Sequence, residues 1–282
     1  MIIKDLVCSI GISGYYNWDL AGIKAGGQPV GFTMIGNTVT PGFTHLIQPG
    51  EIISIMLVME DGQVAFGDCM DVILSGAAGR DRLFRAADHI AILESLVRNR
   101  LQGMNCSDFR DLMKLLDGLC LDGQSLHTAV RYGLSQALLH ASALSAGKTR
   151  AEVGAQSDEC CISKYPIPFL SMCPTKEFEL VDKMILKRAD ILPHADFIRV
   201  EEDLGLGAHL MTDYVTWLTK RIKELGGENY NPTLHLDVYG TLGEFFGMDV
   251  DKIADFLGNL KERTKGLSLL IETPIIAPTQ NA

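Results

Sequence analysis

Residues 234–240 read Leu-His-Leu-Asp-Val-Tyr-Gly, and residues 268–274 read Ser-Leu-Leu-Ile-Glu-Thr-Pro. Both are short apolar segments typical of buried strands, and each carries a carboxylate near its end, Asp237 or Glu272. The stretch between them, 250–264, has the spacing of an amphipathic helix. Two strands joined by a helix pair in parallel, so we expect both carboxylates at the same C-terminal edge of one sheet.

Strands and helices alternate throughout the second part of the chain. We predict strands at 166–172, 181–187, 233–238 and 268–272, and helices at 208–225 and 250–264. Strands that alternate with helices form a parallel sheet, which places this part in the α/β class. Four such strands in about 120 residues make half of an eight-stranded (β/α) barrel, because a complete barrel takes roughly 250 residues.

The first part of the chain has a different pattern. Two β-branched runs at 52–60 and 64–69 flank Asp61-Gly62, a turn signal, and together they predict a hairpin. Three stretches with helical periodicity follow, at 82–101, 109–119 and 126–146. Polar residues and paired cysteines at 155–165 predict a linker. We therefore predict an α+β domain at 1–160 and a second domain at 161–282.

Composition limits the classes of partner. The 282 residues carry a net charge of −10, which opposes binding to nucleic acid or to an anionic membrane. No apolar run approaches the roughly 20 residues of a membrane span, and the N-terminus has no pattern of a signal peptide. The seven cysteines lack the spacing of a zinc site, as in a protein with reduced thiols. We expect a cytoplasmic protein that binds neither nucleic acid nor a membrane.

The residues themselves leave the chemistry of the sheet edge open. Carboxylate oxygens suit Mg²⁺, so Asp237 and Glu272 are candidate metal ligands. The alternative is that both are capping or loop carboxylates. From the pattern alone, His194 is an ordinary loop histidine, and His235 and His127 have structural roles.

Several stretches resemble the methylaspartate ammonia-lyases of the enolase superfamily. They include Asp122-Gly123 and Leu126–Leu139, and also 39–44, 75–81, 181–187, 192–195 and 232–241. The resemblance implies an enolase-like fold, in which an α+β capping domain precedes a TIM-type (β/α) barrel, here its first half. It also implies Mg²⁺-assisted elimination of ammonia from L-threo-3-methylaspartate to give mesaconate, a step of amino-acid (glutamate) fermentation. The resemblance further implies a homodimer, a small amino-acid substrate and a monovalent cation such as K⁺.

The resemblance also assigns roles to individual residues. Asp237 and Glu272 fall on the first and second metal-ligand positions, and His194 falls on a catalytic histidine that also contacts the substrate. Met172 stands where the family places a substrate-binding glutamine, although a thioether has no hydrogen to donate. Other members of the superfamily carry a catalytic Lys-x-Lys on a strand here. The predicted strand 181–187 has lysines four residues apart instead, which disfavours a racemase or dehydratase.

The family's base lysine and third metal carboxylate fall beyond residue 282 in this comparison. Two interpretations of function therefore remain. The first is a carbon–nitrogen lyase. The alternative is a catalytically inactive truncated or split half of that enzyme, which acts only as a partner or is a gene remnant.

Overall fold

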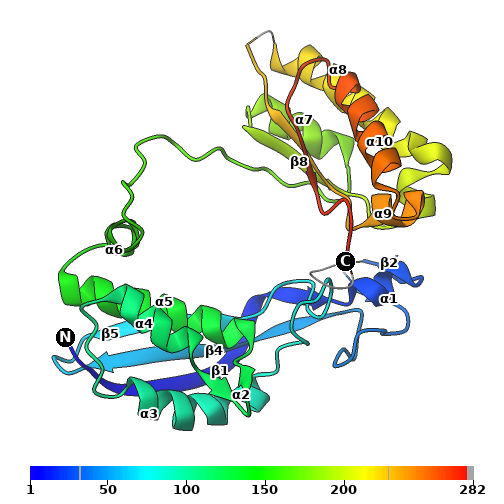
Figure 1. Ribbon diagram of the computed structural model, residues 1–282. Coiled ribbons are helices and arrows are strands. Elements are labelled where there is room, and N and C mark those ends of the chain that lie inside the picture. The colour runs from blue at the N-terminus through cyan, green and yellow to red at the C-terminus, as the bar shows by residue number, and fades with distance from the viewer. Residues whose placement is uncertain (32, 228, 278–282) are drawn as a thin grey trace. The chain divides into compact units, whose positions relative to one another are not determined.

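The computed structural model describes residues 1–31, 33–227 and 229–277. The chain divides into two compact units, Met1–Lys164 and Tyr165–Ala282, and each has its own hydrophobic core (Figure 1). Helices and strands occur in both units, so the predicted mixed α/β class is confirmed. Among the described residues, no helix combines the length and the apolar character needed to cross a membrane.

An antiparallel sheet forms the base of the first unit. Its order is β1-β4-β5, with β1 at Ile3–Trp18, β4 at Ile47–Met59 and β5 at Val64–Met70. The predicted hairpin is therefore confirmed as β4 and β5. Strand β1 was not predicted, because only one of its faces is buried in part and two glycines interrupt its pattern.

Helices cover one face of this sheet. Those that contact it are α2 Ala86–Ile92, α3 Arg98–Leu101 and α5 Thr128–Ala146, with a π-helical segment, Leu93–Val97, between α2 and α3. Two more helices, α4 Phe109–Asp117 and α6 Arg150–Ser157, pack on α5, and α1 is Leu20–Lys24. Two short ribbons complete the unit, β2 Gln28–Val30 with β3 Thr33–Ile35, and β6 Cys120–Leu121 with β7 Gln124–Ser125. The predicted helices 109–119 and 126–146 are confirmed, whereas the predicted helix 82–101 begins only at Ala86.

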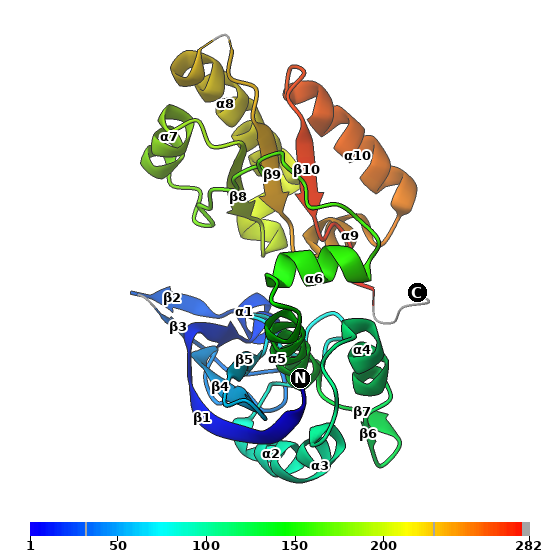
Figure 2. The same cartoon turned by 90° about the vertical axis from the view of Figure 1, so that its left-hand side faces the viewer.

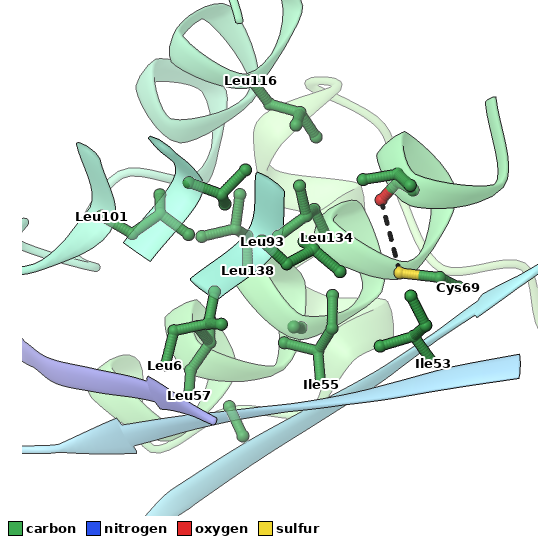
Figure 3. Close-up of a cluster of buried hydrophobic side chains, with 14 of the residues drawn as sticks. Leu6, Ile53, Ile55, Leu57, Cys69, Leu93, Leu101, Leu116, Leu134 and Leu138 are labelled. Carbon is green, nitrogen blue, oxygen red and sulfur yellow. Dashed lines mark hydrogen bonds between the residues drawn. The ribbon is translucent and has the colours of Figure 1, made fainter. Parts of the chain in front are cut away.

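The core of this unit lies between α5 and the sheet, as Figure 3 shows for Leu134, Leu138 and Ile55. Gly133 of α5 allows a close approach, since a Cβ there would lie 2.5 Å from the backbone nitrogen of Cys69 in β5. The helix backbone therefore packs directly on the strand.

Asp19 is a buried carboxylate that holds the start of α1. It accepts hydrogen bonds from the backbone of Gly22, from the backbone of Val39 at 2.6 Å, and from the hydroxyl of Thr40 at 2.6 Å. Burial raises the pKa of Asp19, but the hydrogen bonds from Thr40, Val39 and Gly22 outweigh burial, and the pKa lies below its usual range. The ionised form therefore stabilises the folded state.

We expect Asp19→Ala to lower the free energy of unfolding by about 3 kcal/mol at pH 7, since several charge-assisted hydrogen bonds are lost. A lowered folded-state pKa contributes stability above the unfolded value of about 3.9 and loses it as the pH falls. The difference between the two proteins should therefore shrink below about pH 4. Urea denaturation as a function of pH measures it. Asp61→Ala, at an exposed turn, is the control, and an equal effect there would contradict the prediction.

A parallel sheet forms the centre of the second unit (Figure 2). In the described residues its order is β10-β9-β8, with β8 at Ile191–Asp196, β9 at Thr233–Asp237 and β10 at Leu269–Glu272. The helices are α7 Phe178–Leu186, α8 His209–Gly226, α9 Thr241–Phe246 and α10 Val250–Arg263, with short helical segments at Val200–Leu204 and Leu206–Ala208. The predicted strands 233–238 and 268–272 and the helices 208–225 and 250–264 are confirmed within one or two residues.

Two predicted strands of this unit are wrong. Residues 181–187 belong to α7, because Val181, Met184 and Ile185 are buried at helical spacing. Lys183 and Lys187 therefore share no strand face, and the argument that they disfavour a racemase or dehydratase fails.

Residues 166–172 make one bridge, Leu170 with Ile191, rather than a strand. Two backbone hydrogen bonds flank this bridge, from Ile191 to Phe169 and from Ser171 to Ile191. The described residues of the unit thus hold three parallel strands and an extended segment beside β8, and not four strands.

The two faces of the sheet differ in chemistry. Leu192, Leu234 and Leu236 are fully buried with residues of α7 and α8 in the core of the unit. His235 and Asp237 alternate with these leucines on β9, so they point to the opposite face. The helices therefore cover an apolar face, and the polar side chains gather on the other.

Candidate metal and substrate site

Three carboxylates lie in register across the C-terminal ends of the three strands. Asp196 of β8 is opposite Asp237 of β9, and Asp237 is opposite Glu272 of β10. As expected, Asp237 and Glu272 are neighbours at one edge of a parallel sheet. Asp196 was not predicted as a site residue. Its signal was present in Leu-Pro-His-Ala-Asp, where an apolar run again ends in a carboxylate two residues after a histidine, as in Leu-His-Leu-Asp.

Two histidines connect this row of carboxylates. The Nδ1 atoms of His194 and His235 are 2.9 Å apart, and Nε2 of His235 lies 3.2 Å from Oε2 of Glu272. Nε2 of His194 faces Oδ1 of Asp196 at 3.9 Å. His194 sits at an irregularity in the pairing of β8 with β9, where its φ of 51° falls in the left-handed region. A backbone of this kind is costly for a non-glycine residue and is typical of functional sites.

The hydrogen bonds assign the protons of the two rings. If His235 donates from Nε2 to Glu272, its neutral ring accepts at Nδ1, and Nδ1–H of His194 is the donor. Nε2 of His194 then keeps its lone pair on the side of Asp196. Burial and the nearby His194 lower the pKa of His235, which favours this neutral ring. His235 was expected to be merely structural, but the structure makes it the link between Glu272 and His194.

Burial and mutual repulsion govern the carboxylates. Burial, followed by the charge of Asp237, raises the pKa of Asp196 to about 7. Burial and then the charge of Glu272 raise the pKa of Asp237. Lys176, which pairs with Asp203 at 2.7 Å and contacts the backbone carbonyl of Asp196, offsets part of this negative charge. The cluster therefore holds more negative charge than its protein partners neutralise.

The donor set fits a divalent cation. His194, His235 and Glu272 offer ligand atoms within 4.8 Å of one another, and so do His194, Asp196 and Asp237. Within the described residues, the buried Oδ1 of Asp196 has no hydrogen-bond partner. An orphaned carboxylate oxygen beside other carboxylates is the environment that a hard cation stabilises.

The remaining predicted residues lie apart from this cluster or at its border. Met172 belongs to the extended segment beside β8 and is 55% exposed. Cys173, next to it, donates a backbone hydrogen bond to the carbonyl of Pro193. His127 caps α5 in the first unit, where it accepts from the backbone of Ala129, in line with the structural role expected of it.

Comparisons with known proteins identify the family. Models for the methylaspartate ammonia-lyase N-terminus and C-terminus match residues 1–158 and 161–282. The methylaspartate ammonia-lyase of Clostridium tetanomorphum is 43% identical over 276 residues, which are 98% of this chain and 67% of that protein. Its solved structure, a Mg complex of beta-methylaspartase, has a TM-score of 0.82 at 42% identity, over 98% of this chain and 67% of that one.

A second solved structure is similar along the same span. The Citrobacter amalonaticus methylaspartate ammonia-lyase containing (2S,3S)-3-methylaspartic acid matches with a TM-score of 0.88 at 42% identity, over 98% of this chain and 68% of that one. The chain spans about two thirds of the length of these relatives. The two family models together cover nearly all of the sequence, and the identity to these relatives exceeds 40%. The chain belongs to the methylaspartate ammonia-lyase family of carbon–nitrogen lyases.

Proposed function

We propose that this chain carries the cation- and substrate-binding edge of a methylaspartate ammonia-lyase, which converts L-threo-3-methylaspartate into mesaconate and ammonia. The observation that carries the proposal is the row of Asp237 and Glu272 at the ends of adjacent parallel strands, with His194 beside it. The Mg complex of one relative and the 3-methylaspartic acid in another support the same cation and substrate class.

The reaction breaks the C3–H and C2–N bonds of the substrate and forms the double bond of mesaconate. Asp237 and Glu272 would hold Mg²⁺, which when bound neutralises the substrate carboxylate and the negative charge that develops on it. Asp237 is 5% exposed, so it is largely shielded from water, and its Oδ1 accepts from the backbone of Tyr239 at 3.2 Å. Electrostatic stabilisation is stronger in such a shielded site than in bulk water.

His194 would contact the substrate through Nε2. Its ring is held by His235, and His235 by Glu272, so a lone pair points from a fixed position toward the cluster. A ring held in this way can accept a hydrogen bond from the ammonium group or take a proton during elimination. Met172 adjoins β8 on the extended segment, and an apolar thioether there would contact carbon atoms of the substrate rather than its carboxylates.

The match to named ammonia-lyases along 98% of the chain favours a lyase over the alternative of an inactive partner. We extend the proposal to the family's other features: a TIM-type barrel, a capping domain at 1–160 and a catalytic domain at 161–282, a homodimer, a cytoplasmic location, a role in glutamate fermentation and a monovalent cation such as K⁺. The net charge of −10 supports the absence of nucleic-acid and anionic-membrane partners.

The direct test is turnover. Because the chain spans about two thirds of its relatives, the assay uses residues 1–282 joined to the C-terminal third of the Citrobacter amalonaticus enzyme, here called the joined protein. With Mg²⁺ and 3-methylaspartate, we expect mesaconate to form, followed by its ultraviolet absorbance. Chelation of the cation should stop the reaction, and fresh Mg²⁺ should restore it. A folded joined protein that binds Mg²⁺ but leaves 3-methylaspartate unchanged would overturn the proposal.

A further inference from the structure

Two adjacent cysteines, Cys160 and Cys161, lie near the end of the first unit, in the stretch that leads into the second. They follow helix α6, and both are exposed and free of disulfides. The whole stretch from residue 158 to residue 170 is exposed. Thiols on consecutive residues of such a stretch are open to solutes and within reach of each other.

The end of α6 fixes the backbone of Cys160 but does not use its side chain. Glu159 has a left-handed φ of 54°, and the backbone nitrogen of Cys160 donates to the carbonyl of Ala155 at 2.9 Å. The backbone nitrogen of Glu159 donates to the carbonyl of Gln156, and the two bonds together form a Schellman motif. The residue in the place of Cys160 often makes an apolar contact with the helix in such a motif. Cys160 is exposed instead.

The other cysteines lack this combination of exposure and an adjacent thiol. Cys69, Cys106 and Cys173 are buried. Burial raises the pKa of Cys106, and of the half-buried Cys8, to about 11. A thiol with a raised pKa holds little of the thiolate, which is the reactive form. Cys120 is exposed, but neither of its neighbours in the sequence is a cysteine.

We propose that Cys160 and Cys161 form a vicinal dithiol that low-molecular-weight disulfides oxidise reversibly to an intramolecular disulfide. One thiolate attacks a sulfur of oxidised glutathione, and a glutathione thiolate leaves. The second protein thiolate then attacks the protein sulfur of this mixed disulfide, and the second glutathione leaves. The two protons of the protein thiols end on the two glutathione thiols, and oxidised glutathione is the oxidant. This inference does not depend on the proposed function.

Adjacency makes the ring easy to close and easy to reopen. The second step is intramolecular, so the effective concentration of the resolving thiol is high. Accessible cysteines next to a resolving cysteine are typical redox sensors. Consecutive Cα atoms lie about 3.8 Å apart, which is below the range of about 4.4–6.8 Å for ordinary disulfides. The ring is therefore strained, and strained or exposed disulfides are the ones that reduced thiols reopen.

The test identifies the oxidised form of each thiol in the folded 282-residue protein. The protein is incubated with oxidised glutathione at pH 8 and quenched with acid, and peptide mass spectrometry locates the modifications. We expect the peptide with Cys160 and Cys161 to lose two hydrogens without retaining glutathione, and reduced glutathione to restore both thiols. Cys120 has no adjacent resolving thiol, so its oxidised form should retain glutathione. Buried Cys69 should stay reduced, which shows that the protein is folded.

Serine variants separate the pair from a single exposed thiol. In Cys161→Ser, glutathione should remain on Cys160, and the fraction of mixed disulfide should exceed that of the wild type at least about tenfold. Cys160→Ser should have the same effect on Cys161. Cys120→Ser is the matched control and should leave oxidation of the pair unchanged. All three positions are exposed, so the variants should unfold at the temperature of the wild type.

Two results would overturn the proposal. In the first, the wild-type pair retains glutathione to the same extent as the single-thiol variants, because the second thiol then does not resolve the mixed disulfide. In the second, the pair stays reduced at concentrations of oxidised glutathione that modify Cys120. The expected result is an intramolecular disulfide that forms in the wild type and in Cys120→Ser, reopens with reduced glutathione, and is absent from Cys160→Ser and Cys161→Ser.

Discussion

Replacing Asp237 with alanine should lower kcat/KM of the joined protein for 3-methylaspartate by at least about 10³-fold. Asp237 is at the centre of the row, with Asp196 on one side and Glu272 on the other. Its loss should weaken binding of the cation, which supplies several kcal/mol of charge stabilisation to the transition state. Each loss of about 1.4 kcal/mol lowers the rate tenfold. The measurement is the initial rate of mesaconate formation over a range of Mg²⁺ concentrations.

Two further variants make this prediction specific. Asp237→Asn keeps the size of the side chain, so a comparable loss would trace the effect to charge rather than to packing. Asp255→Ala, on the exposed side of α10, is the matched control and should keep its activity within about twofold. If Asp237→Ala retained most of the activity at saturating Mg²⁺, the cation would have to bind elsewhere.

The elements that position Asp237 and Glu272 are predictable because their signals are local. Strands β9 and β10 are apolar runs of ordinary length, and α10 between them begins at a capping aspartate, Asp249, whose side chain accepts from the backbone of Lys252. Parallel pairing then follows from the crossover connection. For this reason, the sequence alone places two of the three carboxylates at one sheet edge.

The third strand was missed for a physical reason. Pro193 interrupts β8, and a proline lacks the N–H group that a strand normally donates, so sequence rules exclude the segment. In the structure its carbonyl still accepts from the backbone of Cys173, and the irregularity at His194 restores the register before Asp196. At 181–187 a strand is predicted where a helix forms, because seven residues are too few to separate the two-residue period of a strand from the 3.6-residue period of a helix. Only burial of Val181, Met184 and Ile185 decides for the helix.

The resemblance to a family found His194 but could not find its partner. The contact between His194 and His235 joins residues 41 positions apart on neighbouring strands, and no local pattern encodes such a contact. A residue within a family motif, such as His194, can therefore be identified from the sequence. A residue that holds it in place, such as His235, can be identified only from the pairing of the strands.

His194→Ala should lower kcat of the joined protein by about 10²–10⁴-fold, the usual contribution of a positioned acid or base. The more informative change is at His235, which makes the 2.9 Å contact with His194 and lies 3.2 Å from Glu272. His235→Phe keeps a ring of similar bulk but removes the acceptor for Nδ1–H of His194. We expect a loss of about 10–100-fold, as for other groups that orient a functional histidine.

If His235 orients His194, replacing His235 should change the tautomer of His194. In the wild type, ¹⁵N chemical shifts should report protonation at Nδ1, because His235 accepts that hydrogen. In His235→Phe they should report a mixture of tautomers. In His235→Gln the amide oxygen can accept from His194 while its nitrogen donates to Glu272, so tautomer and activity should both be largely retained. If His235→Phe leaves the Nδ1 tautomer of His194 unchanged but is as slow as predicted, His235 acts through packing and the relay from Glu272 to His194 is wrong.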